Sequence, residues 1–386
     1  GGAVRLAAAS ADGPVPGAEP PTPAPKPRRP WPRGIWTLLS NLVVTQFGVE
    51  AFGLAVPQFA RERFGYGTVT ALSSASMLAL TVGSLLGGQA ADRFGAEKTY
   101  YGTLALRAAA IGVFAALHAA GALGPVALVS LFAADYLLHY MNYVAVDTLS
   151  AARLSGDAAR LQSFGNRREA IVEIVGLAGP IAAGLAIMTL GYGAIFWAYP
   201  AFFLVTAITG RLALRGARSV GPAKADAGPK AGWLKTLREI MRSPSLRWAV
   251  AGFALLNAVS LSLYFLIGPA FGDAASAASG GSAPQITSLM TGLFAGGGIF
   301  GVWFMSKFMS WRERRLSAPT QGDAYLSRIT VPYMSWALAA TGAALLSFWS
   351  LLSVAPLFTL PPFGLPPLYA AQLLMLPLGL ALSMPY

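Results

Sequence analysis

Gly88-Gln89-Ala90-Ala91-Asp92-Arg93-Phe94-Gly95-Ala96-Glu97-Lys98 is a short charged stretch between two long apolar runs, at about 69–90 and 98–121. Each run is long enough to cross the roughly 30 Å of hydrocarbon in a bilayer, because a spanning helix needs about 20 apolar residues. The charges between the runs therefore belong at a membrane surface, where a tight turn joins two spanning helices.

The composition of the whole chain agrees with a membrane location. Of its 386 residues, 55% are hydrophobic and 11% are charged, and the mean hydropathy is +0.56. One aqueous core could not bury so much apolar surface, so we expect an all-α polytopic membrane protein. The net charge of +12 does not predict a nucleic-acid partner, since the basic residues are scattered through short loops. The lack of cysteine excludes thiol catalysis, thiolate metal sites and disulfides.

Hydropathy predicts ten membrane helices. They lie near 34–58, 69–90, 98–121, 124–149, 168–190, 192–214, 245–271, 285–309, 328–352 and 366–386. Residues 1–33 are rich in Ala, Pro and Gly and are expected to be a disordered tail. Residues 34–214 would form a six-helix bundle, 215–244 a linker, and 245–386 a second bundle of about four helices. The linker carries an amphipathic pattern typical of an interfacial helix or of a solvated one.

The distribution of Lys and Arg predicts the orientation, because these residues favour cytoplasmic loops. The tail ends in a basic cluster, and the predicted turns Gly121–Pro125, Gly191–Gly193 and Phe271–Gln285 carry no Lys or Arg. Arg61 and Arg63 in the first external loop are the exception. We therefore expect an integral protein of the cytoplasmic (inner) membrane with its amino terminus in the cytoplasm.

The charged stretch resembles the signature that links the second and third helices of the major facilitator superfamily. Its matching residues are Gly88, Asp92, Arg93, Gly95 and Lys98, whereas Ala90, Ala96 and Glu97 depart from the pattern. The resemblance implies a major facilitator fold of two six-helix bundles, with the last two helices missing from this chain. It also implies a secondary transporter that works by alternating access, in which the bundles rock about a central site.

A second resemblance lies on the predicted fifth helix. Residues 176–184, which include Gly179 and Pro180, are similar to the Gly-Pro motif of exporters in this superfamily, although Val175 and Ala183 depart from it. Small residues let backbones approach closely, and proline permits a bend. The run from 147 to 169 resembles the corresponding connection in drug and siderophore exporters. Both resemblances favour export.

Polar residues inside the fourth helix indicate a site, because an ionisable group in hydrocarbon is costly unless it is paired or faces water. Asp135, His139 and Asn142 have i, i+4 and i+7 spacing and share one face, and Tyr136 belongs to a neighbouring aromatic stripe. We expect this face to bind substrate or ion. The alternative is a buried hydrogen bond between Asp135 and His139 that only holds helices together.

Other spanning helices carry further candidates. Gln46 and Glu50 lie one turn apart on the first helix, and Glu50 is a candidate proton carrier because removal from water disfavours a charged carboxyl group. Asn257 and Tyr264 share a face of the seventh helix and suit substrate contact or interhelical packing.

Charged residues also predict gating contacts. Arg107 lies roughly 13 Å into the third helix and must find a partner, either Glu173 on the fifth helix or the face that holds His139. Arg107 could form a structural ion pair, take part in gating or bind an anionic substrate. Near the cytoplasmic boundary, charged residues are expected to form a network that breaks when the bundles rock. Its members are Asp92, Arg93, Asp147, Arg168 and Glu169.

These observations predict a transporter and not an enzyme. We expect ion-coupled export of an amphipathic or drug-like small molecule by a monomer without a cofactor, with H⁺ or Na⁺ as the coupling ion. The alternatives are a proton-coupled importer of a solute or metal, a membrane enzyme or metal site at Asp135 and His139, and a non-transporting assembly factor of the same fold.

Overall fold

The computed structural model describes residues 31–154, 158–214, 268–279 and 282–297, with a few positions between 238 and 251 and at 307. Its contacts divide the chain into two units, Gly1–Trp31 and Pro32–Tyr386. All elements below belong to the second unit.

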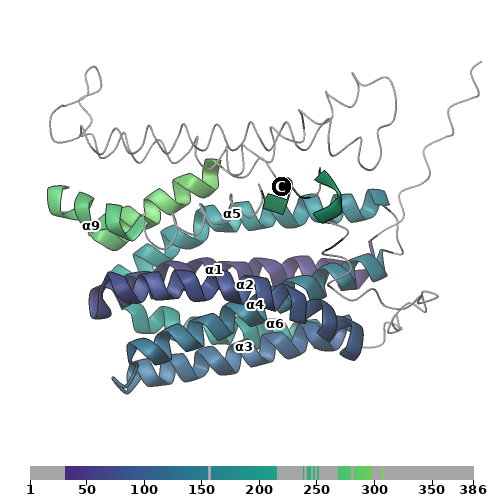
Figure 1. Cartoon of the computed structure of the whole chain (residues 1–386), viewed down its shortest axis with the longest axis horizontal. Helices are drawn as coiled ribbons and strands as arrows, with labels where there is room; N and C mark the ends of the chain where they lie inside the picture. The colour runs from purple at the N-terminus through teal and green to yellow at the C-terminus, as the bar shows by residue number, and fades with distance from the viewer. Residues whose placement is uncertain are drawn as a thin grey trace, which may run out of the picture. The chain divides into compact units, whose positions relative to one another are not determined.

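Every element in these ranges is an α-helix. The first six are α1 (Arg33–Phe64), α2 (Tyr66–Phe94), α3 (Ala96–Ala119), α4 (Pro125–Arg153), α5 (Ala158–Leu190) and α6 (Tyr192–Leu214). They are followed by α9 (Gly268–Ser279) and by helical residues 283–297. Figure 1 shows α1 to α6 running side by side.

The charged stretch that separates the second and third helices contains a turn of one residue. α2 ends at Phe94 and α3 begins at Ala96. Gly95 between them has φ 88° and ψ 143°, a region that residues with a side chain rarely adopt. The predicted tight turn is therefore confirmed, although helix continues through most of the charged stretch.

Small residues set the closest helix approach in the bundle. α2 packs along α4, and a Cβ added to Gly83 would lie 2.5 Å from the carbonyl oxygen of Leu137. A Cβ added to Gly87 would lie 2.7 Å from the Cα of Met141. Two backbones can approach this closely only where glycine presents no side chain.

Aromatic rings fill the centre of the bundle. Phe52 of α1 stacks on Tyr199 of α6 at 4.4 Å between ring centres and meets Phe114 of α3 edge-on at 5.3 Å. α3 packs on both α4 and α6, and α1 packs on both α5 and α6. The aromatic core therefore joins helices that are not consecutive, α1 with α3 and with α6.

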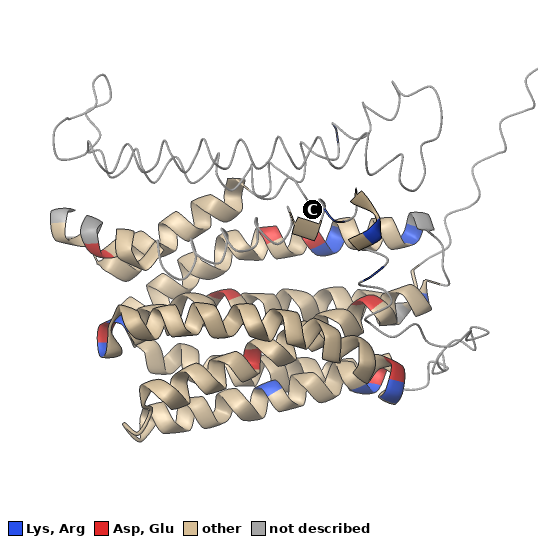
Figure 2. Ribbon diagram, in the orientation of Figure 1, with Lys and Arg blue, Asp and Glu red and all other residues tan. Residues whose placement is uncertain are grey.

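The helices have the lengths and compositions of membrane spans. Within the described residues, five helices, α1, α2, α3, α5 and α6, are long and apolar enough to cross a bilayer. α4 has 29 residues but carries the polar groups Asp135, His139 and Asn142, which lower its hydropathy. Charged side chains gather near the helix ends and are sparse between them (Figure 2). The prediction of an all-α polytopic membrane protein is confirmed.

Several predicted boundaries are wrong in the same direction. α1 continues to Phe64 and not to 58, and α5 starts at Ala158 and not at 168. Hydropathy marks only the apolar part of a helix, whereas helix propensity also favours the charged and alanine-rich residues beyond it. The predicted turn Phe271–Gln285 is also wrong, since α9 covers Gly268–Ser279 and helix resumes at 283. The predicted helices at 328–352 and 366–386 lie outside the described residues, and the division into domains stays a prediction.

Candidate functional site: a polar cavity beside a buried charge cluster

A cavity of about 200 Å³, here called the polar cavity, lies among α1, α3, α4, α6 and the helix at 283–297. Its lining residues are Gln46, Val49, Glu50, Phe52, Gly53, Arg107, Asp135, Tyr136, His139, Tyr140, Tyr199 and Phe294. The wall therefore combines ionisable groups with five aromatic rings besides the imidazole. The predicted residues Gln46, Glu50, Asp135, Tyr136 and His139 thus line one space.

Arg107, Asp135, His139 and Tyr199 form a charge cluster on one side of this cavity. The Arg107 guanidinium donates from Nε to Asp135 Oδ1 at 2.7 Å and from Nη2 to Asp135 Oδ2 at 3.1 Å. Its Nη2 also donates to the Tyr199 hydroxyl at 2.7 Å, and that hydroxyl donates to Asp135 Oδ2 at 3.1 Å. Arg107 and Asp135 are each only 1% exposed. The two hydrogen bonds of this fork compensate both charges, which are buried away from bulk water.

The aromatic neighbours of Arg107 add to its stabilisation. Its guanidinium carbon lies 4.0 Å from the centre of the Phe203 ring, within the range of a cation–π interaction. Its Nη1 lies 3.1 Å from His139 Nδ1. The sequence indicates two possible partners for Arg107: Glu173 and the face of α4 that holds His139. Of these two, Arg107 contacts the α4 face. Asp135 and His139 are thereby engaged with Arg107, a position that does not suit two metal ligands.

On the α1 side of the cavity, Gln46 donates from Nε2 to Glu50 Oε1 at 2.7 Å. The i, i+4 spacing places both groups on one helix face. Glu50 also lies against α5, because a Cβ added to Gly179 would be 2.7 Å from the Glu50 Cβ. The Glu50 carboxyl group is therefore held by Gln46 of its own helix, and the base of its side chain packs against the Gly-Pro segment of α5.

The sequence profile of the Major Facilitator Superfamily matches residues 38–327. The chain belongs to the major facilitator superfamily. The match covers most of the chain and agrees with the resemblance at the Gly95 turn. A comparison with curated proteins gave no significant match.

Two solved transporter structures have a similar fold. The nucleoside transporter NupG aligns with a TM-score of 0.67 and 15% identity, over 91% of this chain and 80% of that chain. An auto-inhibited peptide transporter of the POT family aligns with a TM-score of 0.57 and 15% identity, over 91% and 81%. Identities this low show the shared fold alone. The family match identifies this chain as a membrane transporter.

In this transporter, the face of α4 predicted to carry the site meets α3. Asn142 donates from Nδ2 to the carbonyl oxygen of Tyr100 and to Thr103 Oγ1, both at 2.8 Å. Asp135 and Asn142 therefore both hold α4 to α3, so the predicted common face exists. Asn142 is not part of the cavity wall, and its role as a substrate contact stays a prediction.

The glycines of α5 serve close packing on two sides. A Cβ added to Gly176 would lie 3.4 Å from the Cβ of Ala295, and one added to Gly184 would meet Ser288. Gly179 faces α1 instead, as described above. Pro180 lies within α5, which continues as helix to Leu190. The small residues therefore let α5 pack against α1 and against helix 283–297.

Charged groups at the end of the bundle near Gly95 form ion pairs, some of them between members of the predicted network. Arg168 pairs with Asp147 and, at 3.3 Å, with Glu169. Arg153 of α4 pairs with Glu97 of α3. Gly88 and Asp92 lie in the last two turns of α2 with Arg93, whose guanidinium is 5.4 Å from the Phe94 ring centre. The link from these residues to Asp147 stays a prediction, as does the role of Glu173.

At the other end, near Gly65, the structure shows a contact that the sequence did not predict. Arg61 of α1 pairs with Asp273 of α9 and donates to the carbonyl oxygen of Pro269 at 3.2 Å. The Tyr66 hydroxyl of α2 donates to Asp273 Oδ2 at 2.7 Å. We call Arg61, Tyr66, Pro269 and Asp273 the α9 clasp. Its sequence signal was Arg61 itself, the basic residue that broke the orientation pattern.

Sequence reasoning also missed Tyr199 and Gln58. Tyr199 lies in an apolar stretch of α6, and nothing in its spacing distinguishes it from a core aromatic residue. Gln58 of α1 is 0% exposed, and neither side-chain amide atom has a hydrogen-bond partner in the part of the chain described. Asn257 and Tyr264 lie outside the described residues. Within the described ranges, no group of three or more His, Cys, Asp or Glu could hold a metal ion.

Proposed function

We propose that this transporter exports amphipathic, drug-like small molecules from the cytoplasm and is coupled to a proton gradient. The observation that carries this proposal is the polar cavity, which is lined by Glu50 of α1 and by Tyr136 and Tyr140 of α4. Apolar walls with a few placed polar groups are typical of small-molecule sites.

Glu50 is the group proposed to carry the coupling proton. It lines the cavity, accepts a hydrogen bond from neutral Gln46 and is in close contact with α5 at Gly179. Asp135, by contrast, is held by the Arg107 fork and is not proposed as the carrier. A protein couples two ligands when each binds its alternative states with different affinity. A carboxylic residue that lines the cavity and packs against a neighbouring helix can supply that difference.

The direction and the membrane are part of the same proposal. The Gly-Pro segment of α5 resembles that of exporters, and it packs directly against the proposed proton carrier. The bias of Lys and Arg supports a cytoplasmic location for the Gly95 end and for the amino terminus in the inner membrane. We also propose that the chain is similar in function to drug and siderophore exporters and works as a monomer. The proposed coupling ion is H⁺ and not Na⁺, and no cofactor is proposed.

Reconstituted vesicles test the proposal. The purified chain is inserted into phospholipid vesicles, an inward or outward pH gradient is imposed, and the movement of ethidium is followed by fluorescence. We expect a gradient to drive ethidium against its concentration difference, and we expect Glu50→Gln to abolish this coupling. Glu97→Gln is the matched control, because this carboxylate pairs with Arg153 away from the cavity.

Three outcomes would contradict the proposal. Gradient-driven ethidium movement that persists in Glu50→Gln would remove Glu50 as the proton carrier. Movement of ethidium and protons in the same direction would indicate an importer, the second function that the sequence left open. A set of cationic, neutral and anionic fluorescent compounds that are all left unmoved would favour the non-transporting alternative.

A further inference from the structure

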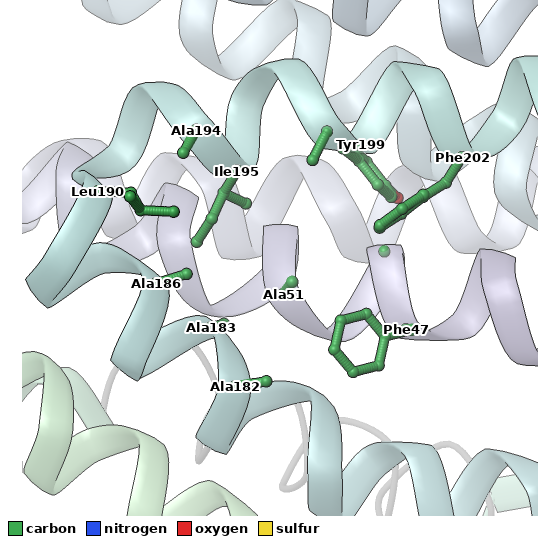
Figure 3. Close-up of a pocket in the computed structure, with 12 residues that line it drawn as sticks. Phe47, Ala51, Ala182, Ala183, Ala186, Leu190, Ala194, Ile195, Tyr199 and Phe202 are labelled. Atoms are coloured by element: carbon green, nitrogen blue, oxygen red, sulfur yellow. The ribbon is translucent and has the colours of Figure 1, made fainter.

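A second cavity of about 160 Å³, here called the apolar pocket, lies between α1, α5 and α6 (Figure 3). Its lining residues are Phe47, Gly48, Ala51, Ala182, Ala183, Ala186, Leu190, Ala194, Ile195, Ala198, Tyr199 and Phe202. The Tyr199 hydroxyl is the one polar side-chain atom among them. That hydroxyl is bonded to Arg107 and Asp135, so the pocket offers water no partner.

The pocket exists because its walls are built from alanine where the neighbouring surface carries large side chains. Its floor, which includes Ala51 and Ala183, is buried, whereas Leu190 on its rim is 71% exposed. Trp197, next to the rim residue Ala198, is 53% exposed. α5 and α6 are both candidate membrane spans, so these exposed apolar surfaces face hydrocarbon and the pocket opens toward it.

Tyr199 connects this pocket to the charge cluster. Its ring forms part of the pocket wall, and a Cβ added to Gly48 would lie 2.6 Å from that ring. Its hydroxyl bonds both partners of the Arg107–Asp135 pair. An occupant of the pocket would therefore touch the ring that completes the cluster beside the polar cavity.

We propose that the apolar pocket binds one acyl chain of a membrane phospholipid, and that this chain braces Tyr199 against α1. An empty space of this size would forfeit dispersion contacts on every side. Apolar protein cavities of about 150 Å³ stay dry and take up apolar molecules of benzene size. The bilayer offers such a group at high local concentration as the acyl chain, and a narrow alanine-lined pocket admits it more readily than the side chains of another helix.

Photochemical labelling tests this site. The chain is reconstituted in vesicles of phosphatidylethanolamine and phosphatidylglycerol that contain a trace of phosphatidylethanolamine with a diazirine in its acyl chain. After irradiation, adducts are mapped by mass spectrometry, and we expect them on the α5 and α6 segments that line the pocket. Filling the pocket with Ala186→Leu and Ala194→Leu should reduce these adducts about tenfold, which corresponds to about 1.4 kcal/mol of affinity.

The matched control is Ala201→Leu, the same change at an exposed position of α6 outside the pocket. Labelling as strong in the filled variant as in Ala201→Leu would overturn the proposal. Labelling that is reduced by added ethidium and unaffected by unlabelled phospholipid would also overturn it, because the pocket would then belong to the substrate. Ala198→Phe, which adds bulk from the exposed rim, replaces the double variant if that variant fails to fold.

The effect on Tyr199 has its own readout. Adding phospholipid back to delipidated protein in detergent should raise the Tm of the unmodified chain and of Ala201→Leu, and it should leave the Tm of the filled variant unchanged. An equal rise in all three proteins would show that lipid stabilises the bundle from elsewhere and would contradict the bracing of Tyr199.

Discussion

At the scale of single residues, the Arg107–Asp135 pair is the most consequential feature, because both charges are buried and either one would be costly to bury without the other. Each residue is 1% exposed, and the two side chains are joined by a pair of hydrogen bonds. We expect Asp135→Asn to lower the free energy of unfolding by about 3–5 kcal/mol, the cost of leaving one buried charge without its partner. Thermal unfolding in detergent measures this loss, and ethidium transport should be lost with it.

A double variant separates stability from function at this pair. Arg107→Gln combined with Asp135→Asn removes both charges, so most of the lost stability should return while transport stays absent. If the double variant were no more stable than Asp135→Asn, the ion pair would not be the source of the effect. If it transported ethidium, the cluster would have only the packing role that the sequence left open.

Gln58 gives a residue-scale prediction of opposite sign. Its side chain is fully buried, with two amide atoms that lack hydrogen-bond partners in the described part of the chain. Gln58→Met keeps the length and removes those atoms, so the free energy of unfolding should rise by about 1–3 kcal/mol. Gln46→Met on the same helix is the control and should give no gain, because that amide bonds Glu50. A lower Tm for Gln58→Met would show that the amide has a partner.

At the scale of helices, the approach of α2 to α4 depends on two glycines that the motif resemblance did not single out. A side chain at Gly83 or Gly87 would meet backbone atoms of Leu137 or Met141, which cannot move aside alone. Gly83→Ala and Gly87→Ala should each cost about 1–3 kcal/mol of stability, as overpacking does. Unfolding of each purified variant by heat or denaturant checks this.

Gly88, the neighbouring glycine that belongs to the family signature, provides the control for the Gly83 and Gly87 variants. Nothing lies within 4 Å of a Cβ added to Gly88, so Gly88→Ala should be neutral or slightly stabilising through helix propensity. Normal folding with lost transport in Gly88→Ala would assign Gly88 a role in motion. Equal destabilisation at all three positions would contradict the packing argument.

What the sequence predicts depends on the scale of the signal. The first six helices follow from hydropathy, because runs of apolar residues are local, whereas helix ends depend on propensity and extend past them, as α5 does to Ala158. Spacing placed Asp135 and His139 on one face. Spacing could not find Tyr199, which is 64 residues from Asp135 along the chain. Only packing of α6 onto α3 brings that hydroxyl to the pair.

At the scale of the whole molecule, the α9 clasp joins the first two helices to a segment about 200 residues later in the chain. It includes Arg61, one of the two residues that depart from the charge pattern. Arg61 lies at the Gly65 end with a side chain that is only 8% exposed, because it pairs with Asp273. Its position therefore does not argue against the proposed orientation. In a transporter that alternates between two openings, a contact at one end favours the state closed at that end.

Loosening the clasp should open the Gly65 end. The side chain of Asp273 is 41% exposed, so losing the pair should shift the equilibrium by only about 0.2–1 kcal/mol, or up to about fivefold. The chain has no cysteine, so Val49→Cys in the cavity wall provides a single reporter. We expect Asp273→Asn to increase the rate at which a membrane-impermeant maleimide labels this cysteine from the Gly65 side.

The same reporter gives the control and the decisive comparison. Arg63→Gln removes a neighbouring charge outside the clasp and should leave the labelling rate unchanged, whereas Tyr66→Phe should act in the same direction as Asp273→Asn. Because the two openings compete within one equilibrium, labelling from the Gly95 side should fall as labelling from the Gly65 side rises. Faster labelling from both sides would mean that the variant loosens the whole bundle, and the clasp would then be a packing contact and not a gate.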